Sequence, residues 1–166
     1  MRFKIVSLIA VAGLVAACGT APTSETASTS GSGVASTAST ASTASNIVPG
    51  SAEDLKVNVG DRVFFGFDRY NLTAQARNIL QKQAAWMIAN SNVSVTIEGH
   101  CDERGTREYN LALGDRRANA AADYLMTLGV PATRISTISY GKERPEDPAS
   151  NEIAWAKNRR GVTLVK

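Results

Sequence analysis

Histidine and cysteine are scarce in this chain of 166 residues, which contains one His and two Cys. A single imidazole excludes most histidine-based metal and catalytic sites. Two cysteines at distant positions, Cys18 and Cys101, exclude a disulfide-rich scaffold and a zinc site built from several thiolates. Excess charge is lacking too: without Arg2 and Lys4, 16 basic side chains face 15 acidic ones. A nucleic-acid-binding domain needs a far more basic face, so we expect no nucleic-acid partner.

The apolar run at residues 5–17 is too short to span a bilayer, which needs about 20 residues. It follows two basic residues and ends in small residues, as in a secretory signal peptide. The sequence VAAC at residues 15–18 resembles the bacterial lipobox, whose cysteine is lipidated and becomes the first residue of the mature protein. We therefore predict a signal peptide at residues 1–17 and lipidation of Cys18. By the same resemblance, Gly19 in place of Asp favours the outer membrane, with the rest of the chain facing the periplasm.

Residues 19–52 are almost entirely small or polar, since 29 of these 34 are Ser, Thr, Ala, Gly or Pro. Such a composition cannot bury a core, and its many Ser and Thr residues disfavour a helical stalk. We predict that residues 18–52, including the lipidated cysteine, form a flexible tether with a root-mean-square reach of roughly 30 Å. Residues 53–166 are long enough for one domain with its own core.

The hydrophobic pattern of residues 53–166 alternates between the strand and helix periods. Strands are predicted over residues 63–67, 93–97, 135–140 and 162–165, and helices over residues 72–89, 107–128 and 150–158. Gly129 and Pro131 stop the second helix. This alternation predicts an α/β fold, an α+β sandwich in which about four strands form a mixed sheet with the helices packed on one face.

The segment that starts at Glu98, EGHCDERGTREYNLALGDRRANAAADYL, carries the most specific pattern in the chain. It resembles the OmpA-like peptidoglycan-binding family, whose core pattern is matched by Asp102, Gly105, Asn110, Leu113, Arg117 and Ala118. A narrower pattern, DERGT-EYN followed by LG-RRA, SYGKE-P and AKNRR, is similar to the lipoprotein branch of this family. The matching elements extend from Phe65 to Arg160. Two positions depart from the branch, which usually has proline at Arg107 and a small residue at Cys101.

The resemblance implies an outer-membrane lipoprotein that binds the diaminopimelate-containing stem peptide of peptidoglycan, without covalent attachment, catalysis or a cofactor. It also implies TolB as a partner and a role in the Tol-Pal system, in envelope integrity and cell division. The ligand site that we expect comprises nine residues: Phe67, Asp68, Asp102, Arg104, Gly105, Thr106, Asn110, Leu113 and Arg117.

The chemistry of two charged residues supports such a site. Diaminopimelate ends in an ammonium beside a carboxylate or its amide, so its recognition needs an anion next to a cation. Asp102 can accept hydrogen bonds from the ammonium, and Arg117 can hold the carboxylate with a bidentate fork that lysine lacks. Replacing either residue by alanine is then expected to abolish binding while the fold survives.

Local signals bring these two side chains together. Gly105 eases the chain reversal that places Asp102 beside the second helix, and Thr106 is in position to cap that helix. Asn110 and Leu113 lie three residues apart and share a helix face with Arg117.

Two alternatives compete with this interpretation. Asp102 and Arg117 could pair with each other in a surface charge network. Glu98, His100 and Asp102 alternate along a strand, so they could instead hold a metal ion in a periplasmic hydrolase.

Cys101 follows His100, but adjacent strand residues face opposite ways, which excludes a thiol–imidazole nucleophile. Cys101 has the same parity as Val95 and Ile97, so we predict that its thiol faces the core. The pair at residues 159–160, two arginines, could form a phosphate site, but its position before a final strand favours a structural role.

Overall fold

The computed structural model describes residues 47–166. The predicted signal peptide, the lipidation of Cys18 and the predicted tether up to residue 46 lie outside this range. Among residues 47–166, no helix combines the length and the apolar character that crossing a membrane requires.

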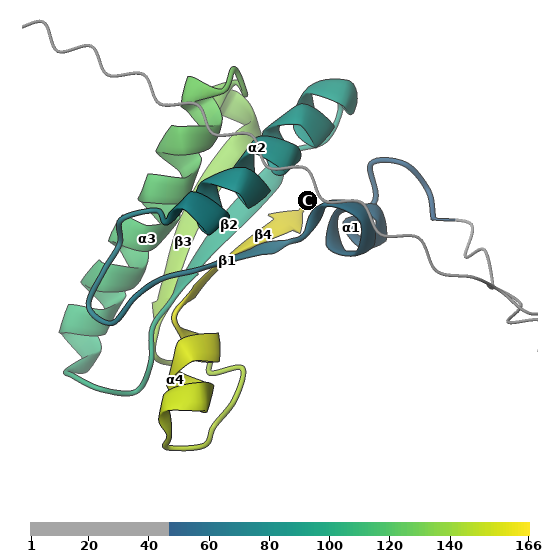
Figure 1. The fold of residues 1–166 in the computed structure, drawn as a ribbon. Helices are drawn as coiled ribbons and strands as arrows, with labels where there is room; N and C mark the ends of the chain where they lie inside the picture. Colours follow the sequence, from purple (N-terminus) through teal and green to yellow (C-terminus); the bar gives the residue numbers. More distant parts are fainter. Residues whose placement is uncertain (1–46) are drawn as a thin grey trace, which may run out of the picture. The chain divides into compact units, whose positions relative to one another are not determined.

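A four-stranded mixed sheet forms the centre of the domain (Figure 1). Its spatial order is β1 (Arg62–Phe64), β4 (Arg160–Val165), β2 (Val95–His100) and β3 (Ile135–Gly141). β4 runs antiparallel to both β1 and β2, whereas β2 and β3 are parallel. The predicted mixed sheet of four strands is therefore confirmed.

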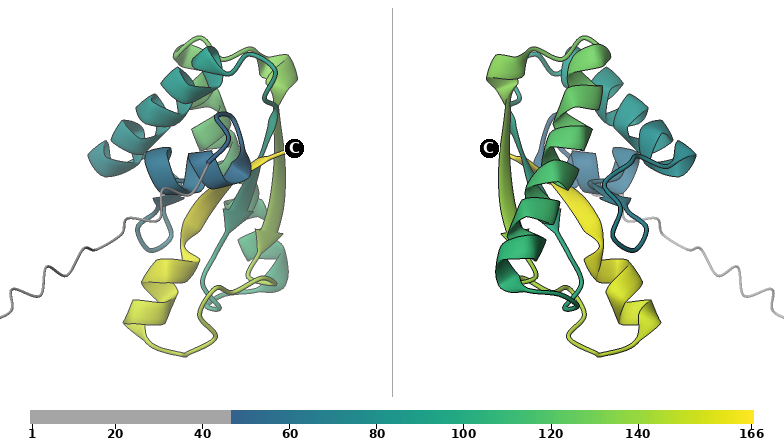
Figure 2. Two further views of the ribbon diagram at one scale, coloured as in Figure 1. Left: turned by 90° about the vertical axis from the view of Figure 1, so that its right-hand side faces the viewer. Right: turned by 90° about the vertical axis from the view of Figure 1, so that its left-hand side faces the viewer.

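The two long helices, α2 (Ala74–Ala89) and α3 (Arg107–Thr127), lie against one face of the sheet (Figure 2). This arrangement confirms the predicted fold class. The short helix α4 (Glu152–Asn158) lies beyond the end of the sheet where β2 ends and β4 begins (Figure 1). A 3-10 turn, Ala132–Arg134, leads into β3.

The helix starts follow side-chain capping. The side chains of Thr73, Thr106 and Asn151 each accept a hydrogen bond from the backbone N–H three residues further on, at 3.0 to 3.2 Å. Thr106 is the cap that the sequence predicts. Helices α2 and α4 begin two residues later than predicted. The residues directly before them, Thr73 and Asn151, lie outside the helix and accept hydrogen bonds from backbone N–H groups of its first turn.

The first strand is shorter than predicted, ending at Phe64 rather than at residue 67. Phe65 still donates its N–H to the carbonyl of Arg159, at 2.9 Å. The carbonyls of Phe65 and Gly66 accept instead from the side chains of Arg159 and Arg117, so the sheet pattern stops there. This early end frees the following residues to form a loop.

An N-terminal segment that the hydrophobic pattern did not reveal packs beside α2. It consists of α1 (Ala52–Asp54) and a π-helical turn, Leu55–Val59, in which Leu55 is buried. Trp86 of α2 donates its indole N–H to the Asp54 carboxylate at 2.8 Å. Ser51 caps α1, so the first helix of the described residues starts at Ala52, the last residue of the predicted tether.

The core lies between the sheet and the two long helices, and α3 comes unusually close to the sheet at two glycines. A Cβ atom added to Gly99 would lie 1.9 Å from the carbonyl oxygen of Gly114. One added to Gly114 would lie 2.3 Å from the Ser139 hydroxyl. Backbone therefore packs on backbone here, which fixes the height of α3 above β2. The main apolar members of the core are Leu55, Val63, Phe65, Leu80, Met87, Val95, Ile97 and Leu125.

Candidate functional site

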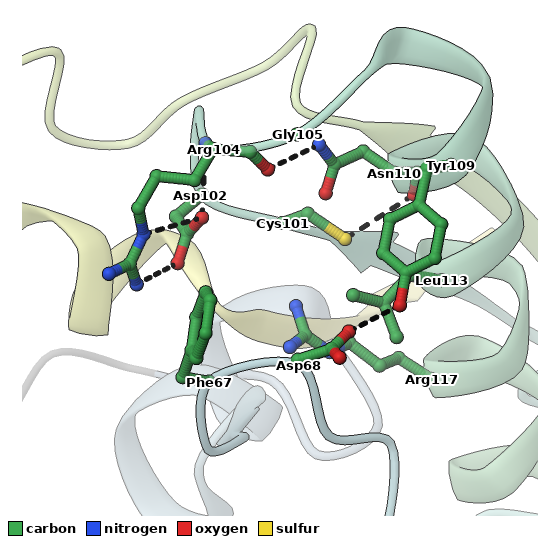
Figure 3. A pocket seen from close by; sticks show the side chains of 10 residues that line it. All are labelled: Phe67, Asp68, Cys101, Asp102, Arg104, Gly105, Tyr109, Asn110, Leu113 and Arg117. Atoms are coloured by element: carbon green, nitrogen blue, oxygen red, sulfur yellow. Dashed lines mark hydrogen bonds and ion pairs between the residues drawn. The ribbon is translucent and has the colours of Figure 1, made fainter.

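A pocket of about 190 Å³ lies where β2 ends and α3 begins (Figure 3). Ten residues line it: Phe67, Asp68, Cys101, Asp102, Arg104, Gly105, Tyr109, Asn110, Leu113 and Arg117. They include eight of the nine predicted site residues. The ninth, Thr106, is not part of the lining, because its hydroxyl caps α3. The fold thus gathers three separate segments of the chain around one hollow.

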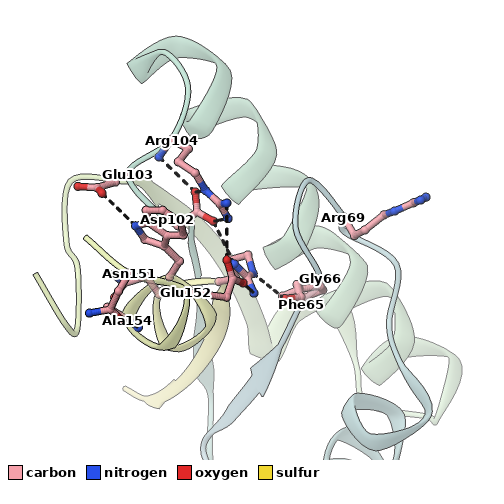
Figure 4. A network of polar contacts seen from close by, with 12 residues as sticks. Phe65, Gly66, Arg69, Asp102, Glu103, Arg104, Asn151, Glu152 and Ala154 are labelled. Atoms are coloured by element: carbon pink, nitrogen blue, oxygen red, sulfur yellow. Dashed lines mark hydrogen bonds and ion pairs between the residues drawn. The ribbon is translucent and has the colours of Figure 1, made fainter. Parts of the chain in front are cut away.

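Asp102 is a buried carboxylate, only 4% exposed. It accepts hydrogen bonds from Arg104 through Nη2 (2.7 Å), Nε (3.3 Å) and the backbone N–H (3.2 Å), and from Arg159 Nη1 (3.3 Å; Figure 4). Burial alone would raise the pKa of Asp102, but these hydrogen bonds outweigh it and hold the pKa below its ordinary value. Asp102 is therefore an anion at neutral pH.

Arg104 covers Asp102 from the solvent side. Its guanidinium carbon lies 4.1 Å from the ring centroid of Phe67 and 4.1 Å from that of Trp155, so two aromatic rings enclose it. A weaker ion pair at 3.7 Å joins it to Glu152 of α4. An ammonium group that approaches Asp102 must therefore share the carboxylate with Arg104 or displace it.

Arg117 is 1% exposed and donates to three backbone carbonyls. Nε bonds the carbonyl of Arg69 (2.8 Å), Nη1 that of His100 (2.8 Å) and Nη2 that of Gly66 (3.1 Å). Burial lowers the pKa of Arg117, but arginine starts so high that the side chain stays charged. These bonds use three of its five N–H groups, and Arg117 also forms part of the pocket lining (Figure 3).

These contacts correct two sequence-based expectations about Arg117. It does not pair with Asp102 in a surface network, since the residue is buried and its hydrogen bonds among residues 47–166 go to carbonyls. Its replacement by alanine should also weaken the fold, because three buried acceptors would lose their donor.

The loop that carries Phe67 and Asp68 has an unusual backbone. Asp68 has a φ of 53°, a left-handed conformation that Asp tolerates better than most residues. Its carboxylate accepts a hydrogen bond from the hydroxyl of Tyr109 on α3. Tyr109 was not predicted as a site residue, although it stands directly before Asn110 in the family pattern.

Asn110 and Gly105 shape the second loop of the pocket. The buried Asn110 donates its amide N–H groups to the carbonyls of Arg104 (2.8 Å) and Thr106 (3.1 Å). Gly105 has a φ of 96°, which only glycine adopts easily. Asn110 therefore positions the loop, and Leu113, also buried, adds an apolar wall.

The metal-site alternative is wrong, because its three side chains do not form one cluster. The strand register shifts between Gly99 and His100, and the strand then ends. His100 bonds Glu98 (3.2 Å), whereas Asp102 turns into the pocket toward its arginines. Within residues 47–166, no group of three or more His, Cys, Asp or Glu side chains is arranged to hold a metal.

His100 is buried on the helix-free face of the sheet, 1% exposed, with its ring stacked on Tyr140 at 5.6 Å. Burial, and then the nearby charge of Arg160, lower the pKa of His100, although Glu98 opposes the shift. Its Nδ1 atom has no hydrogen-bond partner among the described residues. The folded protein therefore holds this imidazole neutral.

We expect acid to weaken the fold through His100. In the unfolded chain this residue takes up a proton below pH about 6.5, and in the folded chain only at lower pH. Between these two values the unfolded state binds more protons, so the free energy of unfolding falls as the pH falls from about 6.5. Urea unfolding of wild type and His100→Gln between pH 7.5 and 5 measures this, and the variant should lose part of the pH dependence. Equal pH dependence of the two proteins would contradict the assignment.

Cys101 is 2% exposed, and its thiol donates to the carbonyl of Asn110 at 3.3 Å. Burial raises the pKa of the thiol to about 11. The predicted core position is confirmed, and the same thiol also forms part of the pocket floor. An un-ionised, buried thiol is a poor nucleophile.

A thiol reagent should therefore label Cys101 slowly in the folded protein. The chain from Gly19 onward is used, because Cys101 is its only cysteine. We expect Cys101 to react completely within minutes in the unfolded protein in urea, and at least tenfold more slowly in the folded protein in buffer. A Cys101→Ser chain with Ser91→Cys on the surface is the matched control and should react rapidly in both. Rapid reaction of Cys101 in the folded state would show that the pocket floor opens.

Comparison with known proteins assigns the class. The sequence model of the OmpA family matches residues 64–159, and the chain belongs to this family. Two relatives are each described as "Peptidoglycan-associated lipoprotein". The one from Agrobacterium fabrum is 54% identical over 117 residues, which cover 70% of this chain and 66% of the relative. The one from Brucella melitensis has the same identity over 70% of each chain.

A solved structure gives the same result. The crystal structure of the peptidoglycan-associated lipoprotein from Burkholderia pseudomallei is 39% identical, with a TM-score of 0.63 over 64% of this chain and 90% of the other. The chain spans about two thirds of the length of the two relatives above. Within the OmpA family, the chain is similar to the peptidoglycan-associated lipoproteins in both sequence and structure.

Proposed function

We propose that the domain binds peptidoglycan by holding the side-chain end of a diaminopimelate residue in the pocket. The observation that carries this proposal is the presence of a buried anion, Asp102, and a buried cation, Arg117, in the lining of one small hollow. Asp102 receives the ligand ammonium, and Arg117 donates its two remaining N–H groups to the neighbouring carboxylate. Phe67 and Leu113 contact the methylene chain. The match of the pocket to the family pattern, and the names of the relatives, support this assignment.

The test uses the chain from Gly19 onward and two kinds of purified sacculi. One carries diaminopimelate in the stem peptide, and the other carries lysine at the same position. Lysine has the ammonium but lacks the carboxylate, so Arg117 loses its partner. We expect the protein to sediment with the first sacculi only, and free meso-diaminopimelate to release it. Equal sedimentation with both, or no release, would count against the pocket.

We propose that the domain binds without cutting the wall. A general acid or base works best when its pKa lies near the working pH, and a thiol nucleophile must be ionised there. The pKa of Asp102 is lowered and that of the Cys101 thiol is raised to about 11, so neither group meets this requirement, and the other carboxylate of the lining, Asp68, is engaged by the Tyr109 hydroxyl. Incubation with sacculi, with and without a chelator, should release no soluble muropeptides above the level of a boiled sample. Release that the chelator stops would restore the hydrolase interpretation.

We propose further that Cys18 carries the lipid that holds the chain in the outer membrane, with residues 18–52 as the tether. The proposal rests on the lipobox-like sequence and on the lipoprotein relatives. Anchored to the membrane and bound to the wall, the chain would link the two layers. Cys18→Ser should move the protein from the outer-membrane fraction to the soluble fraction. A variant that stays in the outer membrane would show that another segment anchors it.

TolB is the protein partner that we propose, and the resemblance to the lipoprotein branch of the family supports it. TolB should co-purify with the chain from Gly19 onward, and the Asp102→Asn variant will show whether this contact depends on the pocket. No co-purification at micromolar concentrations of both proteins would remove TolB from the proposal.

A further inference from the structure

A second hollow lies beside the pocket, between the start of α2 and the middle of α3. Its volume is about 460 Å³, against about 190 Å³ for the pocket. The residues that line it are Tyr70, Asn71, Leu72, Arg77, Ala120, Asp123, Tyr124 and Thr127, and we refer to them as the α2–α3 groove. None of them belongs to the family pattern or to the predicted site.

The α2–α3 groove and the pocket share a wall. Asp68 lines the pocket, and Tyr70, two residues later, lines the groove. On α3, Arg117 lines the pocket and Ala120 the groove, a rise of about 4.5 Å along the helix. Between them, the carbonyl of Arg69 accepts the hydrogen bond from Arg117 Nε, at 2.8 Å. A ligand that extends from the pocket past this shared wall reaches the groove.

The lining of the groove includes two tyrosines, Tyr70 and Tyr124, and further arginines lie close to it in the sequence. The ring of Tyr70 is 45% exposed, and the guanidinium carbon of Arg116 lies 5.9 Å from its centroid. Arg69, next to Tyr70 in the chain, and Arg77 are both exposed, and the lining itself contains one base, Arg77, and one acid, Asp123. Exposed aromatic faces suit sugar rings, and arginines suit carboxylates.

The size of the pocket requires a second contact area for a large ligand. Pockets that enclose a whole small-molecule ligand usually measure about 300 to 1,000 Å³. At about 190 Å³, this pocket holds the end of one amino-acid residue and no more. The remaining part of a stem peptide must lie on the surface outside it.

We propose that the α2–α3 groove binds the sugar-side part of the ligand whose diaminopimelate fills the pocket. The free carboxylate of the acidic residue between diaminopimelate and the sugar pairs with the arginines. The sugar ring that carries the stem peptide lies on the face of Tyr70. This inference rests on the proposed function, and it adds that the domain recognises glycan as well as peptide.

The test compares three ligands by calorimetry with the chain from Gly19 onward. They are free meso-diaminopimelate, the tripeptide L-Ala-γ-D-Glu-meso-diaminopimelate, and the same tripeptide on its disaccharide. Wild type should bind them with stepwise increasing affinity. Tyr70→Ala should lose about tenfold in affinity for the disaccharide tripeptide and nothing for free diaminopimelate. Arg77→Glu, on the exposed face of a helix, should weaken the two longer ligands by at least threefold.

Two matched variants complete the design. Tyr70→Phe keeps the ring face and should bind all three ligands like wild type. Arg107→Ala removes an exposed arginine that is not part of the groove lining and should also leave all three affinities unchanged. Thermal melts show that each variant is folded.

The outcomes separate the two proposals. If wild type binds all three ligands with equal affinity, or if Tyr70→Ala and Arg77→Glu bind the disaccharide tripeptide like wild type, the groove has no role and the pocket stands. If wild type binds none of the ligands, both the pocket and the groove are overturned.

Discussion

Asp102→Asn should reduce binding to diaminopimelate-containing sacculi by thirtyfold or more. The substitution keeps the shape of the side chain but removes the negative charge that the ligand ammonium requires. It also leaves the positive charges of Arg104 and Arg159 next to the ammonium without the carboxylate that neutralises them. Removing one member of a buried charge pair typically costs about 2 to 5 kcal/mol, and about 2 kcal/mol corresponds to thirtyfold in affinity. Sedimentation over a range of sacculus concentrations measures the change.

Asp147→Asn is the matched control, because it removes the same charge from an ion pair with Lys157 outside the pocket. It should bind like wild type. Thermal melts are needed for both variants, since Asp102 also joins its loop to Arg159. A folded Asp102→Asn protein that still binds sacculi with wild-type affinity would place the ligand elsewhere.

Gly99→Ala should be the most destabilising small substitution in the domain. The added methyl group would lie 1.9 Å from the carbonyl oxygen of Gly114, and neither backbone can move without shifting α3 on the sheet. Overpacking against side chains typically costs about 1 to 3 kcal/mol, and a clash with backbone should reach at least the upper end of this range. Loss of about 3 kcal/mol corresponds to a melting temperature lower by roughly 10 °C or more.

Gly66→Ala is the control for this prediction. A Cβ atom there would meet nothing closer than the flexible side chain of Arg69, at 3.4 Å, and its backbone does not have a positive φ. It should melt within about 2 °C of wild type. If Gly99→Ala melts as high as Gly66→Ala, α3 is not held on β2 by direct backbone contact.

The sequence predicts those parts of the fold that depend on neighbouring residues. Thr106 caps α3 because a hydroxyl before a helix meets the N–H three residues on, and this needs no knowledge of the rest of the chain. The burial of Cys101 agrees with the strand parity of Val95 and Ile97, but β2 ends at His100 after a register shift, so the contact of the thiol with the Asn110 carbonyl depends on the fold. The end of β1 likewise depends on Arg117, which is 51 positions away from Gly66. No local pattern contains that information.

In the candidate site, too, some features follow from neighbouring residues and others depend on distant parts of the chain. The spacing from Asp102 to Arg117 places both residues in one pocket, as predicted, but it does not show which atoms they contact. Asp102 pairs with Arg104 and Arg159, and Arg117 bonds carbonyls, because folding brings distant chain segments to each of them. Trp155 was missed for this reason: nothing in a short C-terminal helix indicates a ring stacked on Arg104.

The three carbonyl bonds of Arg117 have a consequence for the entropy of ligand binding. They join the loop at residues 66–69 to the end of β2, so this loop loses its conformational freedom when the chain folds and not when a ligand arrives. The ordering cost that a flexible loop would add to each binding event is therefore absent from this wall of the pocket. If the pocket binds its ligand as proposed, Arg117 contributes to affinity even through the donors that never touch the ligand.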